Sequence, residues 1–261
     1  MNPLQRALIE KAGQEQGWEC ALVSTPDAVE LGSARHKARV RIVQADSSHW
    51  TISLAAGLIA NELVRSFPDK TKGQSFLVSS VEELSGLLRR AAELAQSLPN
   101  QAELTYEARL KQALAEIGPM TTEVERLVMQ RVGQDTFRQA LLDYWGGACA
   151  VTGIALPVIL RASHAKPWAE CATNSERLDV FNGFLLTANL DALFDRGLIS
   201  FNEKGAMIFS QTFVAKTRID LGLAEPLRLR WISEQHQRYL NWHRDHVFER
   251  RYGKEENKCT T

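Results

Sequence analysis

The chain has 261 residues, of which 44% are hydrophobic and 24% are charged, and its 31 basic and 31 acidic side chains give a formal net charge of zero. A chain of this length and composition can bury a sizeable core in one large or two small domains. Zero net charge neither supports nor excludes a nucleic-acid partner, because carboxylates that hold a cation count in the sum yet form a positive site once the metal binds.

The N-terminal residues 1–17 carry Arg6 and Glu10 among alternating polar and apolar residues, so they lack the apolar segment of a signal peptide. No segment approaches the length of uninterrupted apolar sequence that spans a bilayer. We therefore expect a cytoplasmic protein with no membrane partner. The cysteines at positions 20, 149, 171 and 259 include no Cys-x-x-Cys pair. They indicate buried reduced thiols rather than a zinc ribbon or a disulfide framework.

The first hundred residues mix strand-like and helical segments. Alternating or β-branched residues predict strands at 19–24, 37–44 and 50–54. Residues 81–98 predict an amphipathic helix that begins after Ser79 and Ser80 and ends at Pro99. We interpret residues 99–103 as a hinge. Residues 1–100 are therefore expected to form a small α+β domain with an accessory or recognition role.

Two further helices are predicted between the hinge and residue 146. The first covers residues 103–117 and ends at Gly118-Pro119, and the second runs from Thr121 to Trp145, before Gly146-Gly147. Residues 101–146 are therefore expected to form a helical connector.

The pattern changes after Cys149 to strands and turns. We predict strands at 159–163 and 184–187, followed by a short helix at 189–196 that Gly197 caps. Strands at 198–201 and 206–209 flank a turn at 202–205 with glycine at its end. A helix is predicted at 233–251, and residues 254–261 are polar enough to fray. The fold class is α+β, with residues 147–261 as the last domain.

Four polar residues converge at a strand-strand-helix corner in this last domain. His164 ends the first strand, Asn182 precedes the second, and Asp191 and Asp195 lie on the short helix. The spacing of four places both acids one turn apart on one helix face, where two carboxylates can bind one hard cation.

Four segments at this corner resemble the HNH endonuclease family, which has the ββα-metal fold. The similarity is greatest to a branch of restriction-like and defence-associated nucleases. The segments are residues 149–153 (CAVTG), 162–168 (ASHAKPW), 176–183 (ERLDVFNG) and 191–197 (DALFDRG), and residues 137–142 (FRxxLL) and 197–201 (GLISF) also fit that branch. The resemblance spans roughly residues 120–250 and does not cover the first hundred.

The resemblance implies a role for each residue of the corner. His164 matches the general base that activates water, and Asn182 matches the residue that orients it. Asp191 and Asp195 match metal ligands, and Ser163 stands where many members have an Asp or His ligand. A carboxylate at position 191, where the family often has its last His, favours Mg²⁺ or Mn²⁺ over Zn²⁺.

Basic residues beside these motifs are candidates for holding the phosphate. Lys166, Arg177 and Arg196 have this position, although Arg177 can equally pair with Asp179. Trp168 follows a proline, and we interpret it as a packing residue rather than a DNA contact.

The C-terminal segment from Trp242 to Arg251 has two interpretations. Arg244 and its neighbours can form a basic, aromatic helix along a phosphate backbone. Alternatively, the segment is a solvated helix whose apolar face holds Leu240 and Phe248.

We expect a metal-dependent endonuclease that nicks or cuts duplex DNA, in restriction or anti-phage defence. A free nuclease endangers its own genome, so a regulatory protein partner is a further hypothesis. One alternative is a catalytically silent DNA-binding or assembly module, because Ser163 and Asp191 depart from the family pattern. The other is an RNase or toxin with the same site, since the metal chemistry does not distinguish the two nucleic acids.

Overall fold

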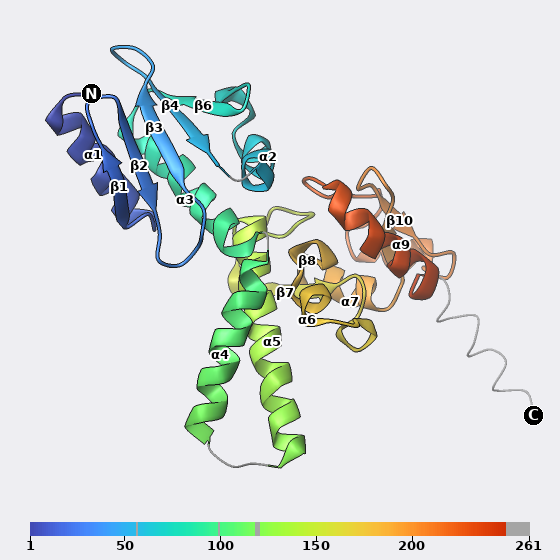
Figure 1. Ribbon diagram of the computed structural model, residues 1–261. Helices are drawn as coiled ribbons and strands as arrows, with labels where there is room; N and C mark the ends of the chain where they lie inside the picture. The colour runs from blue at the N-terminus through green and yellow to red at the C-terminus, as the bar shows by residue number, and fades with distance from the viewer. Residues whose placement is uncertain (56, 99, 118–120, 249–261) are drawn as a thin grey trace, which may run out of the picture. The chain divides into compact units, whose positions relative to one another are not determined.

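The computed structural model describes residues 1–55, 57–98, 100–117 and 121–248 (Figure 1). The chain divides into two compact units, Met1–Gln101 and Ala102–Thr261. Both units contain helices and strands, so the predicted α+β class is confirmed at this level. Within the described residues, no helix is long and apolar enough to cross a membrane.

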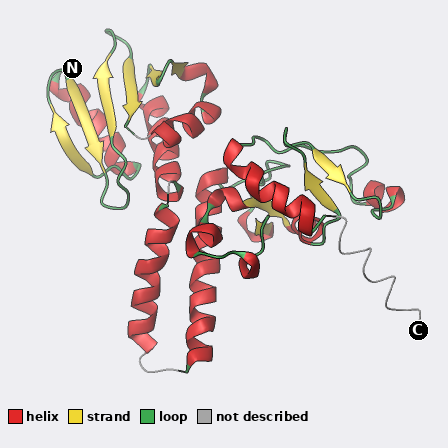
Figure 2. Ribbon diagram, turned by 45° about the vertical axis from the view of Figure 1, so that its right-hand side comes forward, coloured by secondary structure: helices red, strands yellow, loops and turns green. Residues whose placement is uncertain are grey.

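The first unit is built on an antiparallel sheet of six strands in the order β1-β2-β3-β4-β6-β5. Its strands are β1 (Cys20–Ser24), β2 (Ala28–Gly32), β3 (Val40–Gln44), β4 (Trp50–Leu54), β5 (Thr71–Lys72) and β6 (Ser75–Val78). The helices α1 (Pro3–Glu15), α2 (Gly57–Ser66) and α3 (Val81–Ser97) pack on the sheet and on one another (Figure 2). Val40 and Ile42 in β3, and Phe76 and Val78 in β6, are buried with a more exposed residue between them, which is the period-two pattern of a sheet covered on one face.

The strand predictions at 19–24, 37–44 and 50–54 are confirmed by β1, β3 and β4. The helix prediction is confirmed by α3, whose first turn is capped by the Ser80 side chain. The hinge prediction is wrong for residues 101–103, because α4 (Gln101–Ile117) already begins at Gln101; Pro99 lies outside the described residues. Helices α1 and α2 and strands β2, β5 and β6 were not predicted, since none of these segments has a clear pattern of its own.

The second unit begins with α4 and α5 (Thr122–Trp145), which run side by side in both views (Figure 2). The Thr121 hydroxyl accepts a hydrogen bond from the Val124 N–H group at the start of α5. Gly146 ends α5 in the left-handed conformation, with φ of 64°. The predicted helix is therefore confirmed, whereas the break at Gly118-Pro119 falls on residues that the structure does not describe.

The antiparallel pair β7 (Leu160–His164) and β8 (Gly183–Thr187) confirms the two predicted strands. Helix α5 and α7 (Ala188–Asp195) both pack on this pair. Consecutive residues of a strand face opposite sides, so Ser163 and His164 point in different directions. Gly183 lies directly opposite His164 in the strand register. The side chains of Ser163 and His164 therefore lie on opposite faces of the β7–β8 pair.

The remaining elements complete the second unit. Strands β9 (Ile199–Phe201) and β10 (Met207–Phe209) form the predicted hairpin, whose turn ends at Gly205 with φ of 73°. The C-terminal helix α9 (Gln237–His246) is shorter than predicted; residues 249–261, including the segment expected to fray, lie outside the described residues. The other helices are α6 (Asn174–Leu178) and α8 (Ala215–Asp220), and the short 3-10 turns are η1 (Pro68–Lys70), η2 (Pro157–Ile159), η3 (Trp168–Glu170), η4 (Val180–Asn182) and η5 (Glu234–His236).

The core of the second unit is aromatic. Trp145 stacks on Trp231 with ring centroids 4.5 Å apart, and Phe184 stacks on His236 at 5.5 Å. The cysteine prediction is confirmed for Cys149 and Cys171, which are buried free thiols, whereas Cys20 is half-buried. Cys259 lies outside the described residues.

Candidate active site

His164 is held in one orientation at the end of β7. Its ring stacks on Phe137 of α5, with ring centroids 3.7 Å apart and an interplanar angle of 14°. Its Nε2 atom lies 2.9 Å from the carbonyl oxygen of Arg177. A carbonyl only accepts hydrogen bonds, so Nε2 carries the proton and the neutral ring has its lone pair on Nδ1. Within the described residues, Nδ1 has no hydrogen-bond partner.

The electrostatic environment of His164 favours the neutral ring. Burial lowers its pKa from the usual value of 6.5 to about 4, and the hydrogen bond to the Arg177 carbonyl acts in the opposite direction. The ring is therefore an uncharged proton acceptor at neutral pH.

A pocket of about 290 Å³ lies beside this imidazole. It brings together His164 and Asp195, two of the residues that the sequence assigned to one site. The lining residues are Ala162, His164, Pro167, Trp168, Asp195, His243 and Val247.

Ser163 and Asp191 contact each other and are not among the residues that line this pocket. The Ser163 side chain is buried, and its hydroxyl donates a hydrogen bond to the Asp191 carboxylate. The two candidate ligands are thus joined to each other, whereas Asp195 is the acid that shares a pocket with His164. Of the two acids expected opposite the imidazole, Asp195 lines the same pocket as His164 and Asp191 does not.

The donor atoms present are suited to a hard cation. Asp191 and Asp195 offer carboxylate oxygens from one helix, and Ser163 adds a hydroxyl oxygen. Across the described ranges, no group of three or more His, Cys, Asp or Glu side chains is gathered to hold a metal. Mg²⁺ commonly takes only one or two carboxylates and keeps several waters, so this oxygen set fits Mg²⁺ or Mn²⁺ better than Zn²⁺.

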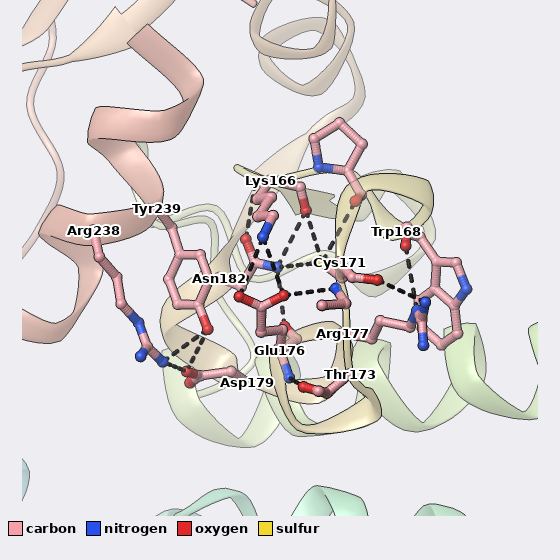
Figure 3. Close-up of polar contacts among 12 residues, drawn as sticks. Lys166, Trp168, Cys171, Thr173, Glu176, Arg177, Asp179, Asn182, Arg238 and Tyr239 are labelled. Carbon is pink, nitrogen blue, oxygen red and sulfur yellow. Dashed lines mark hydrogen bonds and ion pairs between the residues drawn. The ribbon is translucent and has the colours of Figure 1, made fainter. Parts of the chain in front are cut away.

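Asn182 is fully buried and its side chain joins three parts of the connection between β7 and β8 (Figure 3). Its Oδ1 accepts from the Lys166 N–H group, and its Nδ2 lies within hydrogen-bond distance of the Lys166 and Glu176 carbonyls and the Cys171 thiol. Asn182 is connected to His164 through the backbone, because it binds the carbonyl of Glu176, and the carbonyl of the next residue, Arg177, accepts from the imidazole.

Lys166 and Arg177 are both engaged within this connection. The Lys166 ammonium lies 3.1 Å from the Glu176 carboxylate, whose pKa is lowered by the Ala172 N–H group and by Lys166. The Arg177 guanidinium donates to the carbonyls of Trp168 and Cys171 and to the Asn174 side chain. These two cations hold the loop in its conformation, as Figure 3 shows.

Asp179 connects this region to α9. Its carboxylate accepts from Arg238 at 2.6 Å and from the Tyr239 hydroxyl at 2.9 Å, and Arg177 does not take part in this pair (Figure 3). Burial and the Asp179 charge raise the pKa of Tyr239. The hydroxyl therefore stays protonated and donates to the carboxylate.

The two other predicted phosphate contacts differ in exposure. Arg196 is exposed at the end of α7. Arg244 instead donates to the Phe201 carbonyl and to the Glu203 and Asn241 side chains, which fixes α9 on β9. Of the apolar face expected for this helix, Leu240 and Phe248 are both buried.

His243 is a residue of the pocket that the sequence did not reveal. Its Nε2 lies 3.0 Å from the Phe194 carbonyl, its Nδ1 lies 3.0 Å from the Ser200 hydroxyl, and its ring stacks on Phe194 at 3.9 Å. It thus fixes the last turn of α7 next to Asp195. The sequence did not indicate His243 as a pocket residue, because it lies in a helix distant in sequence from His164 and Asp195. A histidine on the apolar face of that helix is the one signal that could have indicated it.

Residues 149–202 match the family model of an HNH endonuclease, which covers β7, β8, α7 and the start of the β9–β10 hairpin. A search of curated proteins finds no match to the chain. The family match supports the HNH family for this segment, and with it nuclease activity in general.

Proposed function

We propose that this chain is a metal-dependent endonuclease that hydrolyses phosphodiester bonds of duplex DNA. The family match over residues 149–202 supports nuclease chemistry and implies DNA as the substrate. The observation that carries the proposal is the state of His164, whose side chain lines a pocket and whose Nε2 proton is committed to the Arg177 carbonyl, which leaves the lone pair on Nδ1.

In this proposal, His164 is the general base. Its Nδ1 atom accepts a proton from a water molecule aligned with the scissile phosphorus, a role for which a neutral imidazole is suited. The Arg177 carbonyl and the Phe137 ring keep the imidazole in place during the transfer.

We propose that Asp191, Asp195 and the Ser163 hydroxyl hold Mg²⁺ or Mn²⁺. A cation bound there would stabilise charge on the phosphate and on the leaving 3′ oxygen. Arg196, exposed at the end of α7, is the predicted cation best placed to meet the phosphate backbone.

The cellular role that we propose is restriction or anti-phage defence in the cytoplasm. The segments 137–142 and 197–201, which resemble the defence-associated branch, support it. Residues 1–100 would select the target or bind a regulatory protein. The test compares phage plating on cells that express the wild type with plating on cells that express His164→Ala. Equal plating would argue against a defence role for the nuclease.

A catalytically silent DNA-binding module is the second candidate function. The hydrogen bond between Ser163 and Asp191 favours it, because the two side chains satisfy each other without a cation.

One experiment separates the candidates. The purified chain is incubated with supercoiled plasmid, linear duplex, single-stranded DNA and RNA, each with Mg²⁺, with Mn²⁺ or with a chelator. Our proposal predicts metal-dependent nicking of duplex DNA. DNA binding without cleavage under any condition would favour the silent module, and preferential cleavage of RNA would favour the RNase.

A further inference from the structure

Two residues of α5 that lie one turn apart support the candidate active site. Phe137 stacks directly on the His164 imidazole. Gly133, four residues earlier and therefore on the same helix face, contacts Trp168 instead. A Cβ atom built on Gly133 would lie 2.2 Å from Cη2 of the indole and 2.9 Å from Cζ2. The indole of Trp168 thus occupies the space that any other side chain at position 133 would fill.

The indole has contacts that limit its movement away from the helix. Its ring centroid lies 6.0 Å from that of His164, in an edge-on arrangement with an interplanar angle of 87°. The Arg177 guanidinium lies 5.6 Å from the same ring, and Arg177 also donates to the Trp168 carbonyl. A displacement of the indole is therefore transmitted to the ring of His164 or to the loop whose carbonyl orients that ring.

A second glycine, Gly183, leaves room for the Phe137 ring. Gly183 lies opposite His164 in the strand register, and a Cβ atom built there would lie 2.6 Å from Cζ of Phe137. Two glycines thus make room for the two aromatic rings that contact the imidazole.

We propose that Gly133 is a positioning residue for the nuclease reaction: by having no side chain, it admits Trp168 against α5, and Trp168 and Phe137 together fix the imidazole plane of His164. This inference rests on the proposed function. It also changes the role of Trp168 from general packing to orientation of the general base.

The main test is Gly133→Ala in the full chain. Gly86→Ala is the matched control, because Gly86 also lies within a helix and a Cβ atom there meets nothing within 4 Å. We expect Gly133→Ala to lower kcat for plasmid nicking by about tenfold to a hundredfold, since misplacement of a catalytic group by about 1 Å has effects of this size. KM and DNA affinity should stay near the wild-type values, and Gly86→Ala should nick at the wild-type rate.

A rescue variant tests whether Gly133 acts through the indole. In Gly133→Ala/Trp168→Phe the shorter ring removes the atoms that clash, so the double variant should nick faster than Gly133→Ala alone. Should Gly133→Ala fail to fold, Trp168→Phe by itself should lower kcat without a matching change in KM. A folded Gly133→Ala with wild-type kcat, a double variant no faster than the single, or wild-type kcat in Trp168→Phe would overturn the inference.

A spectroscopic readout separates this inference from the proposed function. The ring proton resonances of His164, assigned by comparison with His164→Gln, are shifted by the neighbouring aromatic rings. Gly133→Ala should move these resonances and Gly86→Ala should not, whether or not the protein cleaves DNA. Unchanged resonances in Gly133→Ala would refute the positioning role even for an active nuclease.

Discussion

The Nε2 atom of His164 lies 2.9 Å from the carbonyl oxygen of Arg177. This contact selects one tautomer of the imidazole and involves the main chain of Arg177, whereas the Arg177 side chain holds the surrounding loop. Arg177, which the sequence analysis predicted as a phosphate contact, thus instead orients the proposed general base through its main-chain carbonyl. The orientation and the tautomer of the His164 ring therefore depend on the loop between β7 and β8.

Asn182 is expected to control the stability of that loop. Asn182→Ala leaves the Lys166 N–H group and the Lys166 and Glu176 carbonyls without their present partner. We expect the free energy of unfolding of the second unit to fall by roughly 3 kcal/mol, since each buried polar group left unsatisfied costs about 1–3 kcal/mol. Urea denaturation followed by tryptophan fluorescence measures this change. Asn189→Ala, at an exposed position in α7, is the control. A loss in Asn182→Ala no larger than in the control would show that the network is dispensable.

Acid should destabilise the second unit through His243. Burial and, to a smaller extent, the nearby Arg244 charge lower the pKa of His243 from 6.5 to about 4, against the hydrogen bond to the Phe194 carbonyl, which raises it. Asp195 lines the same pocket. In the unfolded chain the pKa is about 6.5, so below that pH the unfolded state binds a proton that the folded state excludes. The stability from neutral His243 is complete above about pH 6.5 and falls by about 3 kcal/mol as the pH decreases to about 4.

Denaturant unfolding at a series of pH values measures this effect. His243→Gln should reduce the dependence of the free energy of unfolding on pH between about pH 6.5 and about pH 4. Part of this dependence should remain, because His164 also has a lowered pKa, of about 4. His246→Gln, at an exposed position on the same helix, should follow the wild-type curve. An undiminished slope in His243→Gln would assign the acid sensitivity to other groups.

Asp191 and Asp195 should both determine metal affinity. Replacing either with Asn keeps an oxygen donor but removes its negative charge, so we expect Mn²⁺ binding to weaken by about tenfold in each variant. Titration calorimetry measures this directly, and Asp220→Asn on the exposed part of α8 is the control. Wild-type affinity in Asp191→Asn would leave Asp191 only as the acceptor of the Ser163 hydrogen bond.

Much of the second unit could be predicted from sequence because its signals are local. Gly146 and Gly197 mark the ends of α5 and α7, and both adopt positive φ values. The spacing of Asp191 and Asp195 and the position of His164 at a strand end follow from the order of the elements. In the first unit, β2 escaped prediction because almost all of its residues are buried, so it shows no alternation.

The contacts that position the site could not be predicted, because they join segments distant in sequence. Phe137 reaches His164 from α5, and His243 reaches the Phe194 carbonyl from α9. The sequence Asn182-Gly183 by itself indicates a turn. In the structure, the Asn182 side-chain amide binds the loop, and the absence of a side chain at Gly183 leaves room for Phe137. Only the three-dimensional packing distinguishes these roles of Asn182 and Gly183 from a simple turn.

The rate of plasmid nicking by His164→Ala tests the central claim most directly. With Mg²⁺ or Mn²⁺ present, the wild type should convert supercoiled plasmid to the nicked form. His164→Ala should be slower by about a hundredfold to ten-thousandfold, the contribution expected of a general base, while its circular dichroism spectrum and DNA affinity stay at wild-type levels. A folded His164→Ala protein that nicks at the wild-type rate would contradict the account.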